Sequence, residues 1–113
     1  MELIKGKYYT KEDFGIGFPR QFGGIFDING EIYTFFTMGE NSLGKKYDDF
    51  PMDDGFVYEG RDDSQLIAYG VQRSGHYQIF TRNFFMGLFT YIGKGCREER
   101  YDDTHNKIFF ETP

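Results

Sequence analysis

Short runs of aromatic and β-branched residues, separated by glycines, recur along this chain of 113 residues. The clearest run is EIYTFFT, from Glu31 to Thr37. Aromatic residues make up 20% of the chain, whereas alanine occurs only at Ala68 and leucine only four times. Long helices need alanine and leucine, and pleated strands favour tyrosine, phenylalanine, isoleucine and threonine. The sequence therefore predicts a mainly β fold and excludes a helical bundle.

Five or six short strands and one or two short helices are expected in a single domain covering residues 1–113. The candidate strands are Glu31–Thr37, Gly55–Glu59, His76–Arg82, Gly87–Gly93 and Lys107–Thr112, of which His76–Arg82 and Gly87–Gly93 should pair. Thr10 and Asp13 resemble a capping box that begins a short helix over Lys11–Ile16, and Ser64–Ser74 is a second candidate helix. A long polar loop is expected over Gly39–Asp54. Strands this short are most stable when the sheet curls into a small β-barrel, because closure removes exposed edges.

The charge of the chain is concentrated in one segment. The net charge is −5, from 13 basic and 18 acidic residues, which argues against indiscriminate binding of phosphates. The segment from Asp48 to Asp63 holds seven acidic residues and one arginine. Its local charge of −6 exceeds the net charge of the whole chain. The remainder of the chain is therefore close to neutral or slightly basic.

Several classes of protein are excluded by what the sequence lacks. No apolar run is long enough to span a membrane as a helix, and no Walker loop, dinucleotide fingerprint or nucleophile elbow occurs. The single cysteine, Cys96, fits a reducing compartment, and with His76 and His105 it shows no metal-ligand spacing. We therefore expect a cytoplasmic domain with no metal, no cofactor, no membrane contact and no catalytic activity of its own.

The segment from Leu43 to Asp63 is the most informative part of the chain. Its long loop carries Tyr47, Asp49 and Phe50, and the strand that follows carries Tyr58. Loops of this length in a compact domain are usually functional or disordered. One interpretation is a solvated acidic turn whose tyrosines belong to the core, and the other is a binding site.

Seven short motifs follow one another along nearly the whole chain. They are Tyr9–Lys11–Asp13, Phe22–Gly23–Gly24–Ile25, Ile32 to Thr37, Tyr47–Asp48–Asp49, Asp54–Gly55 through Tyr58–Glu59–Gly60, Gln78–Ile79–Phe80 and Tyr91–Ile92–Gly93. In this order they resemble the SRA (SET- and RING-associated, or YDG) domains of the PUA-like superfamily. The resemblance is closer to the SRA-like domains at the N-termini of bacterial HNH restriction proteins. Where the family has Gly-x-Gly after the second tyrosine, this chain has Gly60–Arg61–Asp62.

The resemblance implies a PUA/SRA-like β-barrel that binds double-stranded DNA and flips a modified cytosine, 5-methylcytosine or 5-hydroxymethylcytosine, out of the duplex. Extruding a base costs a few kcal/mol, and stacking it on aromatic faces returns about 1–3 kcal/mol. A carboxylate distinguishes cytosine from thymine, because it accepts the N4 amino hydrogen and repels O4. Tyr47 and Tyr58 are the expected stacking faces, with Phe50 beside them. The expected base-reading carboxylate is Asp49, or Asp48 if the register differs by one residue.

Contacts to the DNA backbone are expected from a wider set of groups. The residues in question are Arg20, Gly23, Gly24, Lys45, Lys46, Arg73 and Arg82. Each has a structural alternative, because glycine-rich turns and scattered surface charges are common without a ligand. The adjacent Phe84 and Phe85 either insert into DNA or pack within a hairpin.

The resemblance further implies a non-catalytic targeting module of a modification-dependent restriction endonuclease, with a fused nuclease domain elsewhere in the native protein. Two isolated histidines cannot supply an HNH nuclease motif. Two other functions stay open. One is a PUA-like module that binds RNA or a nucleotide, which suits the acidic balance. The other is a small phage- or defence-associated domain that binds another protein through its aromatic surface.

Overall fold

The computed structural model describes residues 2–17, 24–39, 48–59, 77–84 and 87–111. The strands are β1 (Tyr8–Tyr9), β2 (Ile25–Ile28), β3 (Glu31–Thr37), β4 (Phe50–Met52), β5 (Gly55–Glu59), β6 (Tyr77–Arg82), β7 (Phe89–Arg100) and β8 (His105–Phe110), and a 3₁₀ helix, η1, covers Lys11–Phe14. The predicted mainly β fold with very little helix is confirmed. Among these described elements there is no helix of the length and apolarity that crossing a membrane would require.

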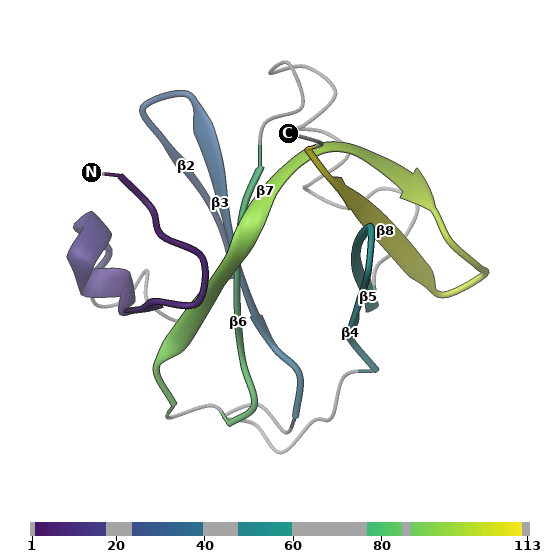
Figure 1. Ribbon diagram of the computed structural model, residues 1–113, viewed down its shortest axis with the longest axis horizontal. Coiled ribbons are helices and arrows are strands. Elements are labelled where there is room, and N and C mark those ends of the chain that lie inside the picture. Colours follow the sequence, from purple (N-terminus) through teal and green to yellow (C-terminus); the bar gives the residue numbers. More distant parts are fainter. Residues whose placement is uncertain (1, 18–23, 40–47, 60–76, 85–86, 112–113) are drawn as a thin grey trace.

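All eight strands belong to one strongly curled sheet. Its order is β2-β3-β6-β7-β8-β5-β4, with β1 added against β7. Only the β3–β6 pair is parallel among the described pairs. In Figure 1, β7 arches across the molecule, with β2, β3 and β6 on one side and β8, β5 and β4 on the other. Because the described strands end at the unpaired edges of β2 and β4, the sheet is open, and the closed barrel predicted from the sequence is not observed.

Two hydrophobic clusters pack against the two faces of this sheet. The inner cluster lies between the two sides of the curl and contains Ile32, Phe36, Phe56, Tyr58, Tyr77, Ile79 and Ile108. The outer cluster lies under the N-terminal segment and contains Tyr9, Ile16, Phe26, Phe35, Phe80, Phe89 and Tyr91. Neighbouring residues of a strand point to opposite faces, so β3 supplies Phe35 to the outer cluster and Phe36 to the inner cluster. The apolar run that identified β3 in the sequence is therefore explained by burial on both faces.

Several predicted elements are found where the sequence placed them. The bounds of β3 and β5 match the prediction, and β6 pairs with β7 as expected, in an antiparallel arrangement. The capping box also forms, since the Thr10 side chain accepts from the Asp13 N–H and Asp13 accepts from the Thr10 N–H. Gly15 ends η1 in the left-handed conformation, at φ 78°. The second candidate helix, Ser64–Ser74, lies outside the described residues.

Four predictions about the elements are wrong. The helix expected over Lys11–Ile16 is the shorter η1, which ends at Phe14, and the strand expected over Lys107–Thr112 is β8, His105–Phe110. Phe50–Met52 was expected within a loop, but it forms β4 and makes a hairpin with β5. The strand expected to end at Gly93 continues as β7 to Arg100, because the polar residues after Gly93 pair with β8. The register of β7 shifts twice, between Ile79 and Phe80 on the β6 side and between Gly95 and Arg97 on the β8 side. These irregularities let one strand curve enough to serve both sides of the sheet.

Replacing Gly95 by alanine should destabilise the fold. An added Cβ would lie 2.4 Å from Ile108 Cγ2 and 3.3 Å from Ile79 Cδ1, both in the inner cluster. Overpacking of this kind costs about 1–3 kcal/mol, so Gly95→Ala should lower the midpoint of urea unfolding. Gly17→Ala is the matched control, because its Cβ would meet no described atom within 4 Å. Equal stability of the two variants would contradict the close approach of β7 and β8.

Candidate functional site

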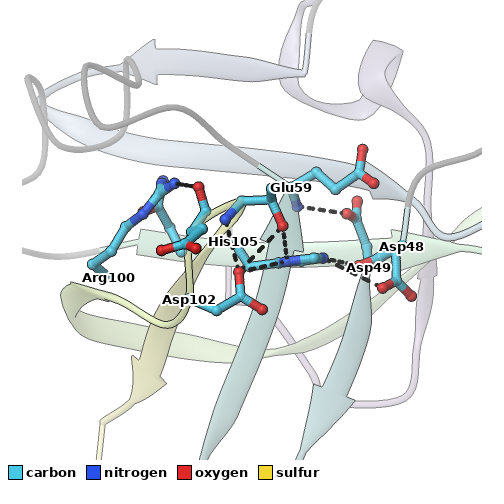
Figure 2. Close-up of polar contacts among 9 residues, drawn as sticks. Asp48, Asp49, Glu59, Arg100, Asp102 and His105 are labelled. Carbon is cyan, nitrogen blue, oxygen red and sulfur yellow. Dashed lines mark hydrogen bonds and ion pairs between the residues drawn. The ribbon is translucent and has the colours of Figure 1, made fainter.

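Asp49 immediately precedes β4, and its carboxylate is half-buried. Its Oδ1 accepts a hydrogen bond from the backbone N–H of Glu59 at 2.8 Å, which joins the start of β4 to the end of β5 (Figure 2). Within the described chain, no cationic side chain forms an ion pair with it. Burial raises the pKa of Asp49 to about 6, and the hydrogen bond from Glu59 opposes this only in part. A half-buried carboxylate without a direct counter-ion costs stability, and such groups gather at functional sites.

His105, the first residue of β8, holds the segment that carries Asp49. Its Nδ1 lies 2.9 Å from Asp102 Oδ1, and its Nε2 lies 2.9 Å from the backbone oxygen of Asp48 (Figure 2). The exposed Asp48 carboxylate is farther away, at 3.5 Å from Nε2. His105 therefore connects the β7–β8 turn to residues 48 and 49, which come more than fifty positions earlier in the chain.

The partners of His105 influence its charge. Nε2 faces the Asp48 carbonyl, and Nδ1 faces both the Asp102 carboxylate and the Thr104 hydroxyl, which lies 2.8 Å away and can donate or accept. Burial lowers the pKa of His105, but the hydrogen bond and charge of Asp102, together with the contact to Asp48, outweigh burial and raise it. The backbone N–H of Thr104 and then His105 lower the pKa of Asp102 to about 2, so this carboxylate stays ionised. A histidine bound to an ionised carboxylate thus anchors the backbone next to Asp49.

Tyr58 lies in the core, which corrects its expected role as a stacking face. Its side chain is 5% exposed, and its ring stacks on Phe36 with the centroids 5.0 Å apart. Its hydroxyl donates to Glu98 Oε1 and accepts from Asn106 Nδ2 at 3.4 Å. Because the ring is buried in the inner cluster, a base could stack on it only by displacing core side chains. The structural interpretation of Tyr58 as a core residue is therefore the one that the structure supports.

The partly exposed rings beside Asp49 are Phe50 and Tyr101. They meet edge to face with centroids 6.0 Å apart, and Tyr101 is 46% exposed. Phe50 also lies 6.3 Å from the His105 ring. Phe50 was among the predicted base-binding residues, whereas Tyr101 was not. These rings lie beside His105, whose Nε2 contacts the carbonyl of the residue before Asp49.

The remaining predicted site residues divide into two groups. Tyr47, Arg20, Gly23, Lys45, Lys46 and Arg73 lie outside the described residues. Gly24 has a packing role, because its carbonyl accepts from the Phe35 N–H at 2.8 Å and an added Cβ would lie 3.2 Å from the Phe35 oxygen. Arg82 ends β6, on the other side of the curl from Asp49 (Figure 1). The structure therefore brings together Asp48, Asp49 and Phe50, and does not join Arg82 to them.

Sequence reasoning missed Tyr101, Asp102 and the role of His105. His105 had been considered only as a metal ligand. A local signal was present, because Asp102 accepts from the Thr104 N–H at 2.8 Å, a turn that aspartate followed by threonine commonly forms. Its partner Asp48 could not be inferred, since the contact depends on how β8 and β5 pair. Across the described segments, no three or more His, Cys, Asp or Glu side chains are grouped to hold a metal ion.

Comparison of the chain with family models, with curated proteins and with solved structures found no match. The functional argument therefore depends on the residues themselves.

Asp49→Asn should stabilise the protein at neutral pH. The pKa of Asp49 is raised from 3.8 to about 6 in the folded state, so its contribution to stability is complete below pH 3.8 and is lost as the pH rises through about 6. Asparagine can still accept from the Glu59 N–H but carries no charge. We expect a gain of about 1–2 kcal/mol at pH 7, reduced by solvent screening, and little change at pH 4.

Urea unfolding of both proteins between pH 4 and pH 8 would measure this difference. The exposed Asp53, in the β4–β5 turn, provides the control variant Asp53→Asn. Its free energy of unfolding should differ from that of the wild type by the same amount at every pH. A loss of stability on Asp49→Asn at pH 7 would show that the buried carboxylate is stabilising, contrary to our account.

Proposed function

We propose that this chain is a DNA-binding module that recognises modified cytosine, 5-methylcytosine or 5-hydroxymethylcytosine, by base flipping. The observation that carries the proposal is the Asp49 carboxylate, half-buried, without an ion pair in the described chain, and engaged through Oδ1 alone. Its second oxygen is available to accept a hydrogen bond from a ligand. The N4 amino group of an extruded cytosine is a donor of the required kind, and the O4 of thymine would be repelled.

The surroundings of Asp49 suit a base that has left the duplex. Phe50 and Tyr101 provide partly exposed rings, and stacking on an aromatic ring contributes about 1–3 kcal/mol per base. In the proposal these rings replace Tyr58 as the stacking surface. His105 acts as a positioning residue, because its contact with the Asp48 carbonyl fixes the backbone that precedes Asp49.

The order of motifs along the chain supports the same assignment. It resembles that of SRA-like domains, and the curled sheet is proposed to correspond to their PUA-like barrel. On this basis the chain is a cytoplasmic, non-catalytic targeting module whose partners are modified double-stranded DNA and a fused nuclease domain. A second candidate is a module that binds RNA or a nucleotide through the same carboxylate, and the acidic net charge suits a small ligand such as a nucleotide better than a long polyanion.

Replacing Asp49 should abolish discrimination between bases without unfolding the protein. Losing a charged hydrogen-bond acceptor costs about 1.5–3 kcal/mol, so Asp49→Ala and Asp49→Asn should bind a 5-methylcytosine duplex about 10- to 150-fold more weakly. Fluorescence anisotropy with duplexes that contain cytosine, 5-methylcytosine, 5-hydroxymethylcytosine or thymine at one position would measure this. The combination of higher stability and lost recognition in Asp49→Asn is the signature of a functional carboxylate.

Asp53→Ala and Asp48→Ala complete the set of variants. Asp53→Ala should leave affinity unchanged, because its exposed side chain lies on the opposite end of the β4 hairpin from Asp49. If Asp48→Ala weakens binding and Asp49→Ala does not, the base-reading carboxylate is Asp48. Tighter binding of RNA or free cytidine nucleotides than of any duplex would favour the second candidate, and wild-type protein that binds all four duplexes equally would reject the DNA-reading proposal.

A further inference from the structure

A second candidate site lies away from Asp49, where β6 ends and β7 begins. An open pocket of about 230 Å³ is present there, and Arg82 and Asn83 contribute to its lining. Three apolar side chains that also line it are unusually exposed: Tyr8 at 64%, Phe84 at 73% and Leu88 at 56%. Large apolar side chains gathered around one pocket often mark a binding surface.

The guanidinium of Arg82 is held in a fixed orientation beside this pocket. Its Nε donates to Thr37 Oγ1 at 2.9 Å, and its Nη1 donates to the Gly87 carbonyl at 3.3 Å. Its central carbon lies 4.3 Å from the centre of the Phe89 ring. All of these partners are neutral, and the described residues provide no carboxylate for this half-buried cation. Several of its N–H donors thus stay available for an anion.

A second cation strengthens the positive charge of this region. Lys11 Nζ lies 5.5 Å from the centre of the same Phe89 ring. Burial and then the charge of Arg82 lower the pKa of Lys11 to about 8, which shows that the two cations affect one another. A negative charge bound at Arg82 would weaken this repulsion. Two cationic side chains therefore lie over the Phe89 ring, in a chain whose net charge is −5.

We propose that this pocket binds a nucleotide unit, with its phosphate on the Arg82 guanidinium and its base on the exposed ring of Tyr8 or Phe84. A guanidinium binds phosphate through paired N–H donors, and an aromatic ring stacks on any base. The combination of an oriented cation with exposed rings suits a ligand that is both anionic and aromatic. The site requires neither cytosine nor Asp49, so it is independent of base reading at the other site. Its ligand can be a unit of a single strand or a free nucleotide.

Thymidine ligands test this site without involving a cytosine reader. Binding of fluorescein-labelled (dT)10 and of thymidine 5′-monophosphate would be measured by anisotropy and by NMR titration at low salt. Arg82→Gln should weaken binding about tenfold or more, and the slope of log affinity against log salt should fall by about 0.7 for the lost phosphate contact. Phe84→Ala, a change at an exposed side chain, should weaken it about fivefold or more. Binding of (dT)10 alone would identify a strand, and binding of both ligands would identify the single nucleotide as sufficient.

Arg97→Gln is the matched control. Arg97 also stacks on a phenyl ring, with its central carbon 3.8 Å from the centre of Phe109, but it is paired with Glu99 at 2.6 Å. It should therefore contribute little to binding. Equal losses for Arg82→Gln and Arg97→Gln would indicate general charge attraction and overturn the site, as would no binding of either ligand by the wild type. A stronger response to N-acetylphenylalanine than to the nucleotide would overturn it in favour of a peptide carboxylate.

Two further variants keep the result interpretable. If Arg82→Gln fails to fold, Phe84→Ala and Arg82→Lys still test the site. Arg82→Lys should weaken nucleotide binding, because lysine keeps the charge but loses the paired donors. Asp49→Asn should bind (dT)10 as the wild type does. Failure of cytosine recognition with intact, Arg82-dependent binding of thymidine ligands would reject the proposed function and leave this site standing.

Discussion

The shared strand β7 is the element on which the rest of the fold depends. It pairs with β1 and β6 along its first half and with β8 along its second half. Close packing against Ile108 leaves no room for a side chain at Gly95, and Gly93 has a positive φ of 142° that other residues rarely adopt. Because β7 bends there, the two sides of the sheet face one another and enclose the inner cluster. In Figure 1, β4, which begins directly after Asp49, and β6, which ends at Arg82, lie on opposite sides of this bend.

The sequence could predict those strands whose own residues determine them. Glu31–Thr37 and Gly55–Glu59 are apolar enough to be recognised alone, because β3 is buried on both faces and β5 along most of its length. β4 was missed because it has three residues, includes Pro51 and forms only by pairing with β5. The second half of β7 was missed because its sequence, KGCREER, is polar and becomes a strand only through β8. Closure into a barrel was a general preference of short strands rather than a property of particular residues.

The candidate site, like the strands, contains residues that the sequence could identify and residues that only the structure reveals. The resemblance to SRA-like domains pointed to Asp49, with Asp48 as the alternative, and the structure places Asp49 half-buried just before β4. Tyr58 belongs to the same pattern, but alternation along β5 turns its ring towards Phe36 in the inner cluster. The Asp102–His105–Asp48 network joins residues far apart in the chain, so only the pairing of strands reveals it. The network explains how a segment rich in carboxylates stays attached to the sheet, since His105 in β8 contacts both Asp102 and the Asp48 carbonyl.

The central claim is that the carboxylate of Asp49 receives the N4 amino group of a modified cytosine. The most direct measurement deletes that amino group from the DNA, by replacing 5-methylcytosine with 5-methyl-2-pyrimidinone in one duplex. Binding of both duplexes to the wild type and to Asp49→Ala forms a double-mutant cycle between protein and base. We predict that the wild type loses about 10- to 150-fold in affinity and that Asp49→Ala binds the two duplexes equally. Equal binding of both duplexes by the wild type would contradict the account. So would a cycle in which deleting the amino group costs Asp49→Ala as much affinity as it costs the wild type.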